Sequence, residues 1–151
     1  MRTNENIVMR EPEIELSIKE GFQYTKLDPI PIDWRSLTFQ DVAEGFSSGS
    51  TPTRKKPEYF KGNVLWITSG ELNYNTIYDT TEKITEEAAK KTGLKILEPG
   101  VFLMAITGLE AAGTRGSCAI VGAKATTNQS CMALKPKSNI EVRYLFYFYC
   151  P

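Results

Sequence analysis

The sequence contains no histidine, and this absence excludes several kinds of active site at once. Without an imidazole there is no Ser-His or Cys-His nucleophile pair, no histidine general base and no histidine zinc ligand. Cysteine is scarce as well, since Cys118, Cys131 and Cys150 are the three in the chain and no Cys-x-x-Cys pair occurs. This pattern predicts reduced, buried thiols and no bound metal.

The chain also lacks long apolar runs and a surplus of either charge. Its longest apolar run, from Tyr144 to Cys150, is too short to span a bilayer. Residues 1–20 are polar and mixed in charge, unlike a secretory signal, so we expect a cytoplasmic protein without a membrane. Lysine plus arginine and aspartate plus glutamate number 18 each, which excludes a strongly basic chain but leaves room for local basic patches.

What is present predicts one globular domain. A length of 151 residues with 41% hydrophobic and 24% charged residues is enough to bury a sizeable core. We expect residues 1–21 to form a flexible arm and residues 22–151 to form the domain. The helix expected over residues 141–150 is apolar nearly all round, favours burial on several sides, and stops at Pro151 without a C-cap. We therefore expect the chain to be truncated at its C-terminus.

Short β-rich apolar runs bounded by turn residues predict buried strands over residues 64–68, 101–107, 117–121 and 130–134. A helix is predicted over residues 86–92, with Thr85 as its N-cap and Gly93 just beyond its end. Residues 45–57 read as a loop and residues 71–76 as a polar turn. Trp34 is expected to anchor its segment in the core. Asn128 and Gln129 are expected to form local hydrogen bonds at the mouth of a strand.

The segment GLEAAGTR, residues 108–115, has the glycine spacing of a phosphate-binding loop. Thr114 stands where that loop needs its lysine, and Arg115 where it needs the Ser or Thr that holds magnesium. We therefore expect no nucleotide hydrolysis. Two interpretations stay open: a connection whose glycines permit positive φ, or a flexible loop close to a ligand backbone, which we favour slightly.

The segment TPTRKKPEYF, residues 51–60, places three consecutive cations between hydroxyl residues and an aromatic pair. Lysine and arginine neutralise phosphates, while hydroxyl groups donate to phosphates or base edges. Local composition alone fits a solvated surface loop equally well.

The order of several such pieces is more specific than any one of them. TKLDPIPIDW is followed by GSTPTRKKPEYFKGNVLWITSGELN, by TTEKITEEA, by LEPGVFLMAITG and by GTRGSCAIVGAKATTNQSCMALKP. This series resembles the N-terminal target recognition domain of specificity subunits of type I restriction-modification enzymes. The similarity runs from about Phe22 to the end of the chain, without the spacer helices and second recognition domain of that family.

The resemblance implies an α+β fold: a single domain with a twisted β core, peripheral short helices and long recognition loops. It implies a non-catalytic DNA-specificity subunit of a prokaryotic defence system that reads one half of a split site in double-stranded DNA. The partners would be the methyltransferase and the nuclease/translocase subunits. The chain itself would hold no cofactor, because S-adenosylmethionine would bind the partner methyltransferase.

The resemblance also implies three loops as the DNA-binding site. Cations would position the DNA backbone, and Asn, Ser and Thr side chains would read base edges, with Asn75 suited to adenine. The predicted site residues are Thr51, Thr53, Arg54, Lys55, Lys56 and Tyr59 in the first loop, Ser69, Asn73, Tyr74 and Asn75 in the second, and Thr107, Thr114, Arg115 and Lys124 around the third.

Two alternatives belong to other functional classes. One is an enzyme that uses Cys118 or Cys131 as nucleophile, with a lysine in place of the missing histidine base. The other is a protein-interaction or carbohydrate-binding module that uses Tyr59, Tyr74 and Tyr78 as exposed platforms.

Overall fold

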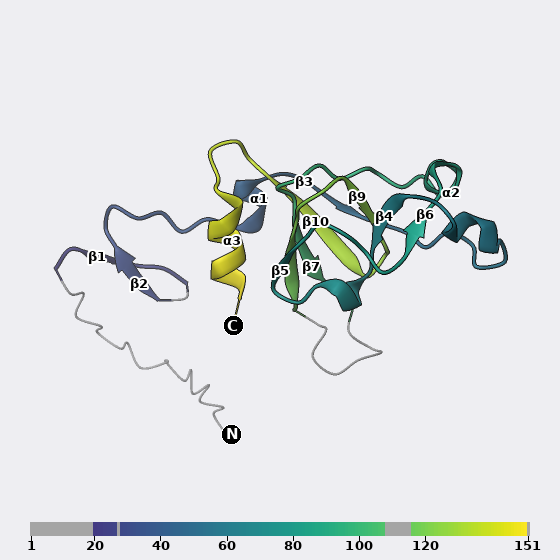
Figure 1. The fold of residues 1–151 in the computed structure, drawn as a ribbon. Coiled ribbons are helices and arrows are strands. Elements are labelled where there is room, and N and C mark those ends of the chain that lie inside the picture. Colours follow the sequence, from purple (N-terminus) through teal and green to yellow (C-terminus); the bar gives the residue numbers. More distant parts are fainter. Residues whose placement is uncertain (1–19, 27, 108–115, 151) are drawn as a thin grey trace, which may run out of the picture. The chain divides into compact units, whose positions relative to one another are not determined.

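The computed structural model describes residues 20–26, 28–107 and 116–150. They fall into two compact units, and the boundary along the chain lies between Ser36 and Leu37. The first unit holds an antiparallel hairpin of β1 (Phe22–Tyr24) and β2 (Pro29–Pro31) (Figure 1). Trp34 is 58% exposed, so the prediction that it anchors the core is wrong. Its carbonyl accepts a 2.6 Å hydrogen bond from the Gln23 side chain, which extends the hairpin without burying the indole.

The second unit contains two small mixed sheets and few helices, which is the predicted α+β class. One sheet has the order β3-β10-β7-β8-β5, with β5 parallel to β8 and the other neighbours antiparallel. The other has the order β6-β4-β9, with β4 parallel to β9. The strands are β3 (Ala43–Ser48), β4 (Val64–Ile67), β5 (Asn75–Ile77), β6 (Lys83–Ile84), β7 (Phe102–Ala105), β8 (Cys118–Val121), β9 (Ala125–Thr127) and β10 (Cys131–Pro136).

The helices of this unit are short. They are α1 (Phe39–Val42), α2 (Glu86–Lys91) and α3 (Val142–Tyr149), with 3-10 turns η1 (Pro57–Phe60) and η2 (Ser69–Glu71). α2 confirms the predicted caps, since the Thr85 hydroxyl accepts from the Ala88 amide and Gly93 has a φ of 68°. None of the helices in the described ranges has the length and apolarity needed to cross a bilayer.

The four predicted strands are confirmed as β4, β7, β8 and β10, and four strands of this unit were missed: β3, β5, β6 and β9. β3 extends to Ser48, so the predicted loop 45–57 is wrong over its first residues. β5 begins at Asn75, inside the predicted polar turn, and β9 reads Ala-Thr-Thr. Neither segment has the apolar run that predicts a buried strand. Both owe their conformation to parallel pairing, β5 with β8 and β9 with β4, which local sequence does not reveal.

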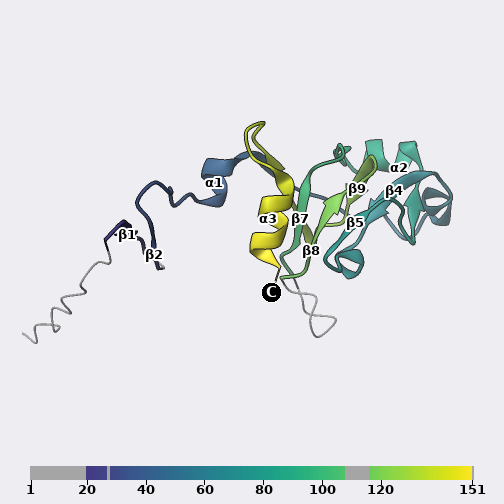
Figure 2. The same cartoon turned by 60° about the vertical axis from the view of Figure 1, so that its left-hand side comes forward.

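Three apolar clusters make up the core. The largest joins the two sheets, and its members include Ile67, Leu72, Leu103, Val121 and Ala133. A second lies under α3, where Leu145 packs with Phe102 and Leu134. Figure 2 shows α3 beside β7. A third surrounds Trp66 next to α2. The outer side of α3 exposes Tyr144, Tyr147 and Phe148, so burial on several sides is not seen among the described residues.

The chain leaves β3 by crossing very close to the end of β9. A Cβ atom on Gly49 would overlap the carbonyl group of Thr127, so only glycine fits this crossing. The next residue, Ser50, donates its amide to the same Thr127 carbonyl at 3.1 Å, and its own carbonyl accepts from the Trp66 indole at 3.1 Å. The start of the first predicted loop is thereby attached to the three-stranded sheet.

This crossing predicts a large difference between two glycines of the same segment. Gly49→Ala should lower the free energy of unfolding by about 1–3 kcal/mol, because the methyl group forces Ser50 away from β9. Gly45→Ala should leave it unchanged or raise it slightly, since nothing lies within 4 Å of the added methyl group. Urea unfolding of both variants measures the two values. Equal effects would show that the chain does not cross β9 at this distance.

Candidate nucleic-acid interface

Seven strand ends meet at one edge of the two sheets. Pairing places the carboxyl ends of β3, β4, β7 and β9 there, together with the amino ends of β5, β8 and β10. Backbone hydrogen bonds join the chain segments next to these strand ends. The amides of Asn128, Ile106 and Tyr74 donate to the carbonyls of Ile67, Ser130 and Cys118 at 2.9, 3.0 and 2.9 Å, respectively. We call this region the polar edge: Ser48, Thr51, Ser69, Asn73, Tyr74, Asn75, Thr107, Asn128, Gln129 and Ser130.

The β9–β10 turn lies at the centre of the polar edge. Asn128 closes it by accepting from the Ser130 backbone amide at 3.0 Å, which confirms the local hydrogen bonding predicted for Asn128. The same prediction for Gln129 is wrong. Gln129 bonds instead to the first loop, from which Thr51 donates to its side-chain oxygen at 2.6 Å and Ser48 to its carbonyl at 3.1 Å. Sequence reasoning did not count Gln129 among the site residues, because its partners are about eighty positions away in the chain.

The second loop is held by a capping box. The Glu71 carboxylate accepts from the Thr68 amide at 2.8 Å and from the Thr81 amide at 2.7 Å. Tyr74 then adopts a φ of 51°, which turns the chain into β5. The predicted residues Asn73, Tyr74 and Asn75 are exposed and Ser69 is half-buried, so all four do lie at the polar edge.

Asn75 has one side of its amide already engaged. Its side-chain oxygen accepts from the backbone amide of Asn73 at 3.2 Å. Within the described part of the chain its nitrogen has no hydrogen-bond partner, which leaves two donors available. These donors are suited to acceptor atoms on a base edge.

The three consecutive cations of the first loop have different environments. The Arg54 guanidinium forms a two-pronged pair with the Glu82 carboxylate at 2.5 and 2.7 Å. It also lies 4.2 Å from the ring centre of Phe60 and 5.4 Å from that of Trp66. The hydrogen bond to Arg54 lowers the pKa of Glu82, so the pair is fully charged near neutral pH. A DNA contact by Arg54 would have to replace this pair.

Lys55 and Lys56 remain exposed in the same loop. Lys56 places its ammonium 3.4 Å from the Tyr59 hydroxyl and 5.1 Å from the centre of that ring. Tyr59 itself is 5% exposed and belongs to the cluster around Trp66, so the expectation that it is an exposed platform is wrong. Tyr74 and Tyr78 are 40% and 70% exposed, as that alternative requires. Thr53 is exposed and holds the turn by accepting from the Lys55 amide at 3.4 Å.

The third predicted group is not brought together. Thr107 is exposed at the polar edge, two residues after the end of β7. Thr114 and Arg115, with the whole glycine loop 108–115, lie outside the described residues. Lys124 stands at the opposite end of β8 and β9, where its ammonium pairs with Glu98 at 3.1 Å. Its predicted place beside Thr107 is therefore wrong. β8 runs away from the polar edge and β9 runs back towards it, so the residues that connect them lie at the far end of both strands.

The cysteines are poorly suited to nucleophilic chemistry. Burial raises the pKa of Cys131 to about 12, and burial together with the Cys150 thiol, 4.0 Å away, also raises the pKa of Cys118. Thiols with such pKa values are neutral near pH 7, whereas a nucleophile needs the thiolate. Among the described residues no group of three or more acidic or cysteine side chains is placed to hold a metal ion.

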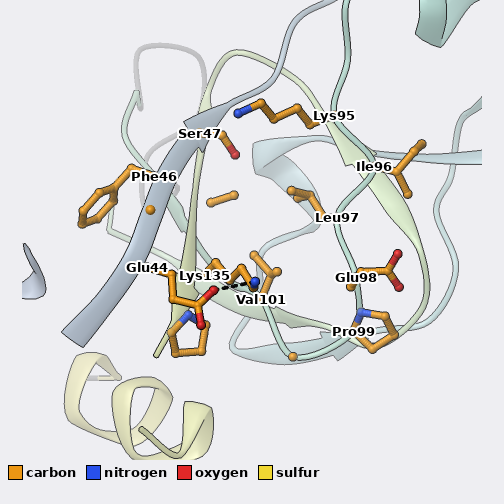
Figure 3. A pocket seen from close by; sticks show the side chains of 14 residues that line it. Glu44, Phe46, Ser47, Lys95, Ile96, Leu97, Glu98, Pro99, Val101 and Lys135 are labelled. Atoms are coloured by element: carbon orange, nitrogen blue, oxygen red, sulfur yellow. Dashed lines mark ion pairs between the residues drawn. The ribbon is translucent and has the colours of Figure 1, made fainter. Parts of the chain in front are cut away.

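A groove of about 600 Å³ lies away from the polar edge. Its walls are the first part of β3, the facing part of β10 and the segment 95–101 (Figure 3). Glu44 on β3 and Lys135 on the neighbouring strand β10 form an ion pair in its wall at 2.5 Å. None of the predicted site residues lines it. The sequence contains no signal for this groove, because three distant segments form it.

Comparison with known proteins gives the family. Residues 31–150 match the model of the type I restriction modification DNA specificity domain. The chain belongs to this family. It is 35% identical over 131 residues to the specificity subunit of the type I restriction enzyme MjaIX of Methanocaldococcus jannaschii, covering 85% of this chain and 29% of that protein. It is 25% identical over 133 residues to the EcoR124I/EcoR124II specificity subunit of Escherichia coli, covering 87% and 30%.

Solved structures share the fold. The specificity-domain chain superposes on the HsdS subunit of Thermoanaerobacter tengcongensis with a TM-score of 0.58 at 19% identity, covering 86% of this chain and 30% of that one. A chain from a structural study of type I R-M complex assembly gives 0.59 at 20% identity, covering 85% and 30%. The chain thus spans about three tenths of its relatives' length. The predicted family is confirmed.

The pair between Arg54 and Glu82 predicts that neighbouring cations contribute differently to stability. Arg54→Ala should lower the free energy of unfolding by about 1 kcal/mol, the sum expected of an exposed ion pair and a cation–π contact. Lys55→Ala should change it by less than about 0.5 kcal/mol. Urea unfolding measures both, and Glu82→Gln tests the ion pair from its other side. Identical values for Arg54→Ala and Lys55→Ala would contradict the structural role of Arg54.

Proposed function

We propose that this specificity domain reads one half of a split sequence in double-stranded DNA for a type I restriction-modification complex and catalyses no reaction itself. The observation that carries the proposal is the polar edge. Four segments far apart in the sequence bring hydroxyl and amide side chains to one surface, and these groups pair with base edges. Membership of a family defined by DNA specificity supports DNA as the ligand.

The exposed lysines and the exposed amide would have different roles in binding DNA. Lys55 and Lys56 lie in the loop that begins at the polar edge, and their ammonium groups would neutralise phosphates and set the register of the duplex. The free amide donors of Asn75 would then reach a base. The tyrosine-based alternative has less support, since one of its three rings is buried.

The remaining assignments follow from the family rather than from the geometry. The partners would be the methyltransferase and nuclease/translocase subunits, and S-adenosylmethionine would bind the methyltransferase instead of this chain. The domain would act in the cytoplasm, where the DNA is accessible. The raised thiol pKa values and the lack of histidine agree with a reader that leaves chemistry to its partners.

Binding to duplex DNA across a salt series tests the role of the lysines. The double variant Lys55→Ala/Lys56→Ala should reduce the slope of log affinity against log salt by roughly 0.9 per lost phosphate contact, hence by up to about 2. Affinity should fall equally for all sequences. Lys95→Ala/Lys124→Ala removes the same charge at the opposite end of the sheets and should leave the slope unchanged. The reverse pattern would place the DNA on the other side of the domain.

Asn75 should behave as a base reader. Asn75→Ala should weaken binding to the cognate duplex by roughly 1–3 kcal/mol and leave non-cognate binding and the salt slope unchanged. Asn63→Ala is the matched control, since this exposed asparagine precedes β4 at the far end of the strand. Competition titrations with cognate and scrambled duplexes measure the difference. A uniform loss of affinity would show that Asn75 contacts phosphate or maintains the loop.

A further inference from the structure

Gln129 combines exposure with a fixed position. Its backbone belongs to the turn that Asn128 closes, and its carbonyl accepts from Ser48 at 3.1 Å. Its side-chain oxygen accepts from Thr51 at 2.6 Å. An exposed glutamine ordinarily samples many rotamers, and holding it still costs conformational entropy. Here that entropy is lost before any ligand arrives, which is the arrangement expected of a preorganised recognition group.

The turn does not need the Gln129 side chain to keep its shape. The backbone bonds from Ser50 to Thr127 and from Asn128 to Ile67 already attach both segments to β9 and β4. The glycine at position 49 fixes the approach of the loop to β9. The pair between Thr51 and Gln129 therefore adds something other than backbone order: it sets which way the amide points.

The amide has one end engaged and one end free. The Thr51 hydroxyl donates to Oε1, which assigns the oxygen to the loop contact and leaves the Nε2 group uncommitted. Within the described residues Nε2 has no hydrogen-bond partner. The centre of the polar edge thus presents two N–H donors in a defined direction.

We infer that Gln129 is a specificity-determining residue that donates from Nε2 to the major-groove edge of a guanine, with Thr51 as the positioning residue that orients the amide. This inference rests on the proposed function. Guanine offers two neighbouring acceptors, O6 and N7, whereas cytosine offers only an N4 donor there. A donor with its oxygen already engaged discriminates most strongly between these two bases.

Selection from a duplex library tests the inference. The purified chain is incubated with double-stranded DNA that has a randomised central segment, and bound molecules are sequenced over successive rounds. The wild-type chain should select a motif in which guanine is preferred over cytosine at the base pair that Gln129 reads. The preference should be about tenfold, corresponding to 1.4 kcal/mol.

Gln129→Glu is the diagnostic variant, because it keeps an acceptor for the Thr51 hydroxyl and replaces the free donors by a second acceptor. It should exchange guanine for cytosine at that one base pair, since a carboxylate accepts from cytosine N4. Preferences at the other positions should persist, although affinity falls for every sequence through repulsion from phosphates.

Two further variants separate orientation from charge. Thr51→Val removes the hydroxyl and keeps the side-chain shape, so the amide is free to turn and the guanine preference should shrink severalfold at the same base pair. Gln40→Glu makes the same chemical change on an exposed glutamine of α1 and should leave the whole motif unchanged. Far-ultraviolet circular dichroism and the urea midpoint show that each variant is folded.

The outcomes distinguish this inference from the function on which it rests. A wild-type motif that Gln129→Glu leaves unaltered at every position overturns the role of Gln129 and keeps the proposed function. A wild-type chain that selects no motif, even when supplied with the partner subunits, overturns both. If Gln129→Glu exchanges the base but Thr51→Val leaves the guanine preference unchanged, Gln129 remains the reader and Thr51 is not its positioning residue.

Discussion

The attachment of the first loop to β9 is the constraint on which the polar edge depends. Gly49 crosses so close to Thr127 that no side chain fits, and Ser50 donates to the Thr127 carbonyl at that point. This contact joins the outermost strand of the five-stranded sheet to the three-stranded sheet. Without it Thr51 would not meet Gln129, and the first loop would leave the surface on which the second loop and the β9–β10 turn lie.

Electrostatics is organised locally in a chain whose total charge is balanced. Five ion pairs in the described residues neutralise cations that the sequence alone counts as free, namely Arg54, Lys83, Lys91, Lys124 and Lys135. Lys55 and Lys56 take part in none of these pairs. Of the three consecutive cations in the first loop, only Lys55 and Lys56 are therefore left without an ion pair among the described residues. They lie next to a surface of neutral hydrogen-bonding groups. Such a division suits a reader in which few charges position and many amides and hydroxyls discriminate.

The fold shared with the solved structures and the side chains at the polar edge are specified by different residues. Solved relatives share the fold at about 20% identity, so the sheets persist while most side chains differ. The strands are specified by buried apolar residues such as Ile67, Leu103 and Val121, which many sequences can supply. The segments at the polar edge contribute little to the core. Their side chains are therefore free to differ between members without loss of the core.

Local sequence determined the elements with strong local signals. Four strands followed from their apolar runs, α2 from its capping residues, and the family from the order of its motifs. The lack of histidine already disfavoured catalysis. Tertiary structure alone decided the rest, because it depended on partners distant in the chain. Pairing created β5 and β9, Glu82 engaged Arg54, burial removed Tyr59 from the surface, and strand direction separated Lys124 from Thr107. The link between Thr51 and Gln129 spans about eighty residues, and no local pattern encodes a hydrogen bond that forms only when two sheets meet.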